Sequence, residues 1–122
     1  MRAILINPFE KKISEVEIQN TLEDLQVAVG DGEKVLITVA CELPNGDVIY
    51  VDDEGLFKPN NAYFTVDGAH QPFAGIGLVV GSTKTGNSTN ARSSIAQITS
   101  MVSMLSRVQL IKYLANELRE ET

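Results

Sequence analysis

The chain has 122 residues but only one cysteine, one histidine and no tryptophan. Because Cys41 is alone, the chain cannot form an internal disulfide or a zinc site built from several cysteines. A zinc site around His70 would need carboxylates for its remaining ligands. The simplest expectation for Cys41 is a half-buried position in a strand.

Long hydrophobic runs are also missing. No apolar run approaches the length of roughly 18 residues that a transmembrane helix needs, so we expect no contact with a membrane. The apolar segment at residues 3–6 stops at Asn7 and Pro8 and is too short for the core of a signal peptide. These features favour a cytoplasmic protein with one modest hydrophobic core.

Basic residues are scarce in the first half of the chain. Residues 1–60 hold 12 acidic and 5 basic residues, whereas residues 61–122 hold 4 acidic and 5 basic ones. Binding to nucleic acid requires a basic patch, so this balance argues against it. An acidic surface suits a basic protein partner, although it also serves solubility. The candidate residues for a partner-binding face are Glu15, Glu17, Asp52, Asp53 and Glu54.

The first half of the chain predicts several strands and one short helix. Apolar patterning indicates strands at 3–6 and 12–18, and a hairpin over 34–52 with an Asn-Gly turn. A short helix is predicted between the second strand and the hairpin. Asn20 can cap this helix, Glu23 can complete a capping box, and Gly30 ends the helix.

A further apolar strand at 76–82 is expected in the centre of the sheet. The resulting fold class is α+β, with a small antiparallel sheet, one short helix and one long C-terminal helix, the helices lying on one face. We expect residues 1–92 to form the sheet and residues 93–122 to form the long helix of the same domain.

Residues 93–118 contain neither proline nor glycine. Their apolar residues form two adjacent stripes at helical spacing, which predicts one long helix that contacts both the sheet and a second copy of the chain. Alternatively, the stripes form a single wide core face, or the helix breaks near Ser106. The residues proposed for a homo-oligomer interface are Met101, Met104, Val108 and Ile111.

The segment GSTKTGNST at 81–89 resembles a phosphate-binding loop in its spacing of Gly81 and Gly86. Asn87 stands where such a loop has its essential lysine, so nucleotide hydrolysis is not expected. The loop remains either a plain connection or a site for a small anionic ligand. In the second case, the binding residues would be Lys84, Arg92, Ser93 and Ser94.

No other motif supplies a catalytic or metal-binding set. The acidic turn at 52–55 lacks the spacing of a calcium loop. A pairing of His70 with Cys41 would place the nucleophile in the middle of a strand, which is an unusual position. We therefore predict no catalytic residues, no metal and no cofactor, and an enzyme is the less favoured interpretation.

Four stretches, MRAILINP, VGDGE, YVDDEGLFKPNNAYFTVDG and PFAGIGLVVG, carry a resemblance to a known family. They resemble small proteins of unknown function that are encoded by bacteriophages, prophages and plasmids. The resemblance covers residues 1–81 and is most specific at 53–56 and 75–81, and residues 82–122 lie outside it. No family residue with an agreed role can be transferred.

The resemblance implies an accessory protein that acts in the cytoplasm of a bacterial host. Such a protein would bind and inhibit a host enzyme or a defence system. The alternative is an oligomeric binding module for an anionic small molecule such as a nucleotide.

Overall fold

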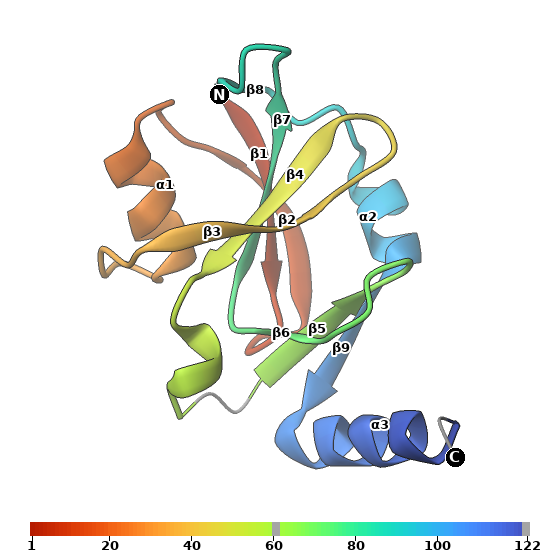
Figure 1. The fold of residues 1–122 in the computed structure, drawn as a ribbon. Coiled ribbons are helices and arrows are strands. Elements are labelled where there is room, and N and C mark those ends of the chain that lie inside the picture. Colours follow the sequence, from red (N-terminus) through yellow and green to blue (C-terminus); the bar gives the residue numbers. More distant parts are fainter. Residues whose placement is uncertain (60–61, 121–122) are drawn as a thin grey trace.

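The computed structural model describes residues 1–59 and 62–120 and contains two antiparallel sheets with helices around them (Figure 1). This architecture confirms the α+β fold class. The elements in chain order are β1 (Arg2–Asn7), β2 (Lys12–Glu17), α1 (Leu22–Val29), β3 (Ile37–Glu42), β4 (Asp47–Asp52), the short 3-10 helix η1 (Gly55–Phe57), β5 (Ala62–Val66), β6 (Phe73–Ala74), β7 (Gly77–Ser82), β8 (Ser88–Thr89), α2 (Ile95–Met101), β9 (Val102–Ser106) and α3 (Arg107–Glu120).

The larger sheet has the strand order β2-β1-β7-β4-β3, and β8 pairs with β7 beyond this path. The smaller sheet has the order β6-β5-β9. The central position of β7 confirms the prediction from its apolar sequence, because Val79 lies between Ile4 of β1 and Ile49 of β4 and all three side chains are fully buried.

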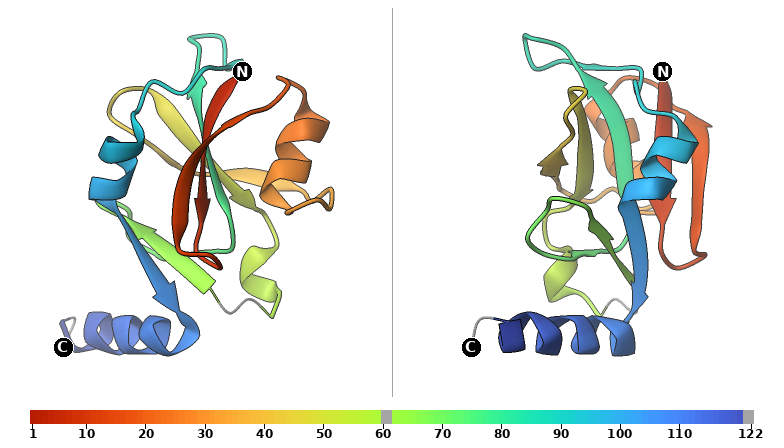
Figure 2. Two further views of the ribbon diagram at one scale, coloured as in Figure 1. Left: turned by 180° about the vertical axis from the view of Figure 1, so that it is seen from behind. Right: turned by 90° about the vertical axis from the view of Figure 1, so that its right-hand side faces the viewer.

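Alternate residues of the larger sheet point into two separate cores, as the period of a strand requires. On one face, Leu78 and Val80 pack with Leu25 and Val29 of α1. On the other face, side chains of β1, β4 and β7 pack against the smaller sheet and Ile98 of α2. The expectation that the helices share one face is therefore wrong: α1 and α2 lie on opposite faces (Figures 1 and 2).

Local sequence signals place the first helix and the hairpin well. The helix α1 begins one residue later than predicted, because Thr21 rather than Asn20 accepts the capping hydrogen bond from Asp24 N. Gly30 ends the helix as expected. The hairpin of β3 and β4 is also confirmed, although its loop spans residues 43–46 and β3 bulges between Val39 and Cys41. Cys41 is half-buried in β3.

The prediction of one continuous helix over residues 93–118 is wrong. The chain forms α2, then the strand β9, then α3. All five residues of β9 pair with β5. The strand β9 thus supplies hydrogen-bond partners to the edge of β5 that does not pair with β6. Val102 and Met104 contact the core while Ser103 between them is exposed. Residues 102–104 therefore alternate with the period of a strand, although Val102 and Met104 also fit the apolar stripes predicted for a helix.

Each of these two helices has its own serine cap. Ser94 and Gln97 form a capping box at α2, and Ser106 accepts a hydrogen bond from Gln109 N at α3. The repeated pattern Ser-x-x-Gln was therefore a visible signal for two helix starts. Residues 93–106 belong to the body of the fold, and Met101 and Met104 are half-buried against its core.

In the described part of the chain, no helix is both long and apolar enough to cross a membrane.

We expect Gly77→Ala to lower the free energy of unfolding by about 1–3 kcal/mol. A Cβ atom at this position would lie 2.6 Å from Cζ of Phe64, so the two sheets could not keep their spacing. The measurement is urea unfolding of the variant in two backgrounds, wild type and Phe64→Leu. Leucine removes the colliding ring edge, so the glycine substitution should cost less there. An equal cost in both backgrounds would show that Phe64 does not limit this contact.

Candidate functional site

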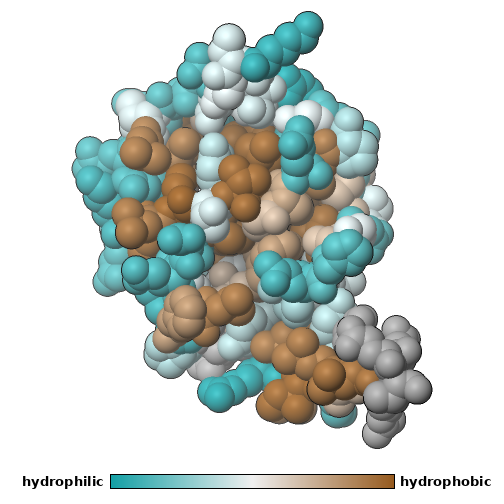
Figure 3. Space-filling view, viewed as in Figure 1, coloured by the Kyte–Doolittle hydropathy of each residue, from teal (hydrophilic) through white to brown (hydrophobic). Residues whose placement is uncertain are grey.

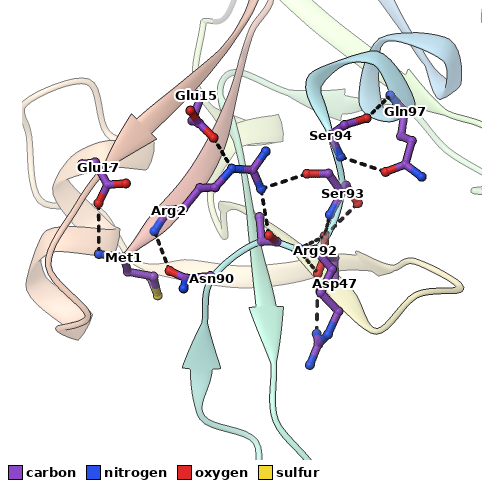
Figure 4. A network of polar contacts seen from close by, with 11 residues as sticks. Met1, Arg2, Glu15, Glu17, Asp47, Asn90, Arg92, Ser93, Ser94 and Gln97 are labelled. Atoms are coloured by element: carbon purple, nitrogen blue, oxygen red, sulfur yellow. Dashed lines mark hydrogen bonds and ion pairs between the residues drawn. The ribbon is translucent and has the colours of Figure 1, made fainter.

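The most connected polar side chain is Asp47, the first residue of β4, and it is fully buried. Its carboxylate accepts hydrogen bonds from Arg92 N at 3.0 Å, from Ser93 N at 2.8 Å and from the Ser93 hydroxyl at 2.7 Å (Figure 4). The guanidinium of Arg92 lies 3.6 Å from the same carboxylate. Asp47 thus joins β4 to the segment that precedes α2.

Arg2 of β1 holds the same segment from the other side. Its Nη1 donates to the carbonyls of Ala91 at 2.7 Å and Ser93 at 2.9 Å, while its Nε pairs with Glu15. The backbone N–H of Arg2 donates to the Asn90 side chain at 2.8 Å. Residues 90–93 are therefore fixed by β1 and β4 together. Our sequence interpretation missed this network, because Asp47 carried only the signal of a turn residue after Asn-Gly.

Three of the four residues predicted to bind an anion have internal partners. Ser93 is buried against Asp47, and Ser94 caps α2. The guanidinium of Arg92 donates to the carbonyl of Ser82 at 2.9 Å and faces Asp47. Lys84 is exposed in the turn between β7 and β8. The segment between β7 and β8 is a hairpin turn, closed by a hydrogen bond from Thr83 N to Asn87 O.

The five acidic residues predicted as one partner face form two separate groups. Glu15 and Glu17 lie on β2, where Glu17 pairs in register with Arg2. Asp52 lies at the opposite end of β4 from Asp47, followed by Asp53 and Glu54, and the strands β1 and β7 separate β4 from β2. Glu15 is ion-paired with Arg2, Glu17 with the N-terminal amine and Asp52 with Lys58.

Two cavities lie one after the other along β3, between this edge strand and the connection from β5 to β6. We call the pair the β3 groove. It consists of a cavity of about 180 Å³ beside residues 38–40 and a cavity of about 440 Å³ beside residues 41–44. Across from β3, the first cavity is lined by Gln71, Phe73 and Ala74, and the second by residues 66–69 and Met101.

The helix α3 presents a second open surface. Figures 1 and 2 show it lying beyond the smaller sheet, away from both cores. Its exposed large apolar side chains are Val108, Ile111, Leu114 and Leu118, which are 63 %, 60 %, 45 % and 66 % exposed. Figure 3 shows the apolar surface that they form on this helix. Val108 and Ile111 of the predicted interface thus lie on an open face, whereas Met101 and Met104 contact the core.

Cys41 and His70 are the two side chains considered above for nucleophilic catalysis. His70 is exposed in the turn between β5 and β6. Cys41 lines the β3 groove, and burial raises the pKa of its thiol above the ordinary value. The described residues contain no group of three or more His, Cys, Asp or Glu side chains that could hold a metal ion.

A family model described as "Domain of unknown function (DUF3846)" matches residues 1–103. The match extends past the 81 residues of the sequence resemblance and includes α2 and the start of β9. Searches of curated proteins and of solved structures each gave no match.

We expect Asp47→Ala to lower the free energy of unfolding by about 3 kcal/mol, because it leaves two buried N–H groups and a hydroxyl without their acceptor. Asp47→Asn keeps one oxygen and should cost less. Urea unfolding gives the energies, and hydrogen exchange at the amides of Arg92 and Ser93 should accelerate in both variants. The exposed Asp53→Ala should change stability by less than about 0.5 kcal/mol. Unchanged exchange at Arg92 and Ser93 in Asp47→Ala would contradict the assigned role.

Proposed function

Because this chain belongs to the DUF3846 family, a domain of unknown function, we propose its role from its surfaces: it is a binding protein that assembles with itself through α3. The observation that carries this proposal is the exposed apolar face of α3. A helix of 14 residues that leaves Val108, Ile111 and Leu118 in water gains stability when it covers them.

The spacing of the apolar residues fits a second helix. Val108, Ile111, Ala115 and Leu118 recur at intervals of three and four residues, the pattern of a helix-pairing seam. The half-buried Leu110 lies on the side that faces the body of the protein. A second copy of α3 presents the same stripe, so two copies can cover each other over a length of about 15 Å.

The environments of Cys41 and His70 support a role without catalysis. The thiolate of a cysteine is its nucleophilic form, and burial disfavours this form at Cys41. His70 is exposed in the turn between β5 and β6, next to Ala69, which lines the same cavity as Cys41. Among the described residues, no hydrogen bond joins the His70 and Cys41 side chains as a nucleophile and its base would require.

We further propose that the protein is an accessory factor of a bacteriophage, prophage or plasmid, and that it inhibits a host enzyme or defence system in the bacterial cytoplasm. The support is the sequence resemblance at residues 53–56 and 75–81 together with the acidic first half of the chain. The helix α3 begins after residue 103, where the family match ends, so the proposed assembly draws no support from the family match.

The alternative, a binding module for an anionic small molecule, ranks second. Its main cation, Arg92, already donates to Ser82 and faces the Asp47 carboxylate. A ligand would have to replace these contacts, and Ser93 would have to leave its buried position. Lys84 is exposed and takes part in none of these contacts. This alternative stays a prediction without a specific contact in its favour.

We expect Val108→Glu with Ile111→Glu to convert an oligomer of the wild-type chain into a monomer, because the carboxylates would be buried against each other in the interface. Sedimentation equilibrium over a range of protein concentrations measures the mass. The control is Asn116→Glu, which adds a carboxylate at an exposed position about a third of a turn from the centre of the apolar stripe on the same helix. A wild-type chain that stays monomeric at high concentration, or a double variant that keeps the wild-type mass, would contradict the assembly.

A further inference from the structure

The two edge strands of the larger sheet differ in how they meet solvent. The strand β2 carries three charged residues among its six, which is a common way to block pairing with another chain. Residues 35–41, which include most of β3, carry none, and Leu36 and Val39 are 61 % and 48 % exposed. In the described part of the chain β3 pairs only with β4. Its other edge is open.

The ladder shows which backbone groups this open edge offers. The carbonyl of Leu36 accepts a hydrogen bond from Asp53 N on the β4 side. Backbone groups alternate between the two edges of an antiparallel strand, so those of Ile37 and Val39 point away from β4. An added strand could bond to them without disturbing the existing pair.

The β3 groove lies directly beside these groups. Its floor is apolar, with Val51 and Phe73 in the first cavity and Leu43, Val66 and Met101 in the second. The bulge of β3 between Val39 and Cys41 lies where one cavity follows the other. Alternate side chains of an extended peptide, about 7 Å apart, can therefore enter successive depressions while its backbone pairs with β3. Figure 3 shows apolar surface in the middle of the view, where Figure 1 places this region of the fold.

The charged residues that line the β3 groove all carry the same sign. Glu42 and Asp67 border the larger cavity, and Asp52 and Asp53 border the smaller one, while neither cavity is lined by a lysine or arginine. Asp52 is ion-paired with Lys58, which leaves the exposed carboxylates of Glu42, Asp53 and Asp67 for a partner. Their field favours a segment with basic residues at its ends.

We propose that β3 binds an extended segment of a partner protein, in which alternate apolar residues are flanked by lysine or arginine. The segment adds a strand to the larger sheet, its apolar side chains occupy the β3 groove, and its basic residues face Glu42, Asp53 and Asp67. This inference rests on the proposed role as a binding protein, but it does not require assembly through α3.

The test uses a fluorescein-labelled peptide of alternating valine and threonine with a lysine at each end, titrated into the full chain and followed by fluorescence anisotropy. A second peptide has glutamate at both ends. We expect the lysine-ended peptide to bind about fivefold more tightly, with a difference that shrinks as salt rises. Bound peptide should also slow alkylation of Cys41 by iodoacetamide, because this thiol lines the groove.

Two variants locate the binding on β3. Val39→Pro removes an N–H group that faces the open edge, where proline is tolerated, and should weaken binding about tenfold. Glu42→Gln with Asp67→Asn should abolish the preference for lysine ends. The matched control is Glu10→Gln with Glu23→Gln, which makes the same change in net charge at exposed positions outside both cavities and should keep the preference.

The outcomes test peptide binding at β3 independently of self-association through α3. Weaker binding in Val39→Pro, with Cys41 protected only in the wild type, supports it. Equal binding of both peptides, or of wild type and Val39→Pro, overturns it. A change of mass in Val39→Pro without a change in peptide binding would show that β3 pairs with a second copy, which also overturns it. The double variant of α3 at Val108 and Ile111 should bind the peptide as the wild type does, so a failure of the assembly leaves this test intact.

Discussion

The buried carboxylate of Asp47 is the interaction on which the arrangement of the two sheets depends. A carboxylate without water is costly unless donors fill its oxygens, and here the donors come from Arg92 and Ser93, some 45 residues later in the chain. The hydrogen bonds to Asp47 hold the connection between β8 and α2 against β4. This connection in turn positions α2, whose Ile98 packs in the core, and β9, which pairs with β5. Gly81 permits the close approach, since a Cβ there would lie 2.3 Å from the carbonyl oxygen of Asn90.

The hydrogen bonds that hold the interior together also distinguish it from the surfaces that stay exposed. Polar groups of residues 90–93 are hydrogen-bonded to Arg2 of β1 and Asp47 of β4, so they contribute to the fold (Figure 4). What stays open lies at the periphery, on the apolar face of α3 and along the edge of β3. These two surfaces differ in chemistry: the first is the face proposed to pair with a second copy of α3, and the second is the edge proposed to bind an extended basic segment. A protein that uses both could hold its own copies and a partner at the same time.

Much of the fold was readable in local patterns, and the errors have a common cause. The strand β7, the hairpin of β3 and β4 and the end of α1 at Gly30 follow from apolar runs, turn residues and caps, each of which acts within a few residues. The segment 93–118 failed because Val102 and Met104 fit a helical stripe as well as a strand alternation. Pairing with β5 decided between the two, and that partner lies some 40 residues away. The same distance in sequence hides the contacts of Arg92 and Ser93, which look available in the sequence but donate hydrogen bonds to Asp47 in the structure.

The sequence by itself determined the α+β class, the central place of β7, the acidic character of the first half and the amphipathic nature of residues 107–118. These follow from the composition and from the periodicity of the apolar residues, both of which can be read along the chain without knowledge of its fold. Only the tertiary structure decided that the five predicted acidic residues form two groups, that Met101 and Met104 belong to the core while Val108 and Ile111 stay open, and that β3 is an open edge. Such properties depend on strand order and on partners distant in sequence, and no local pattern encodes which strand lies outermost in a sheet.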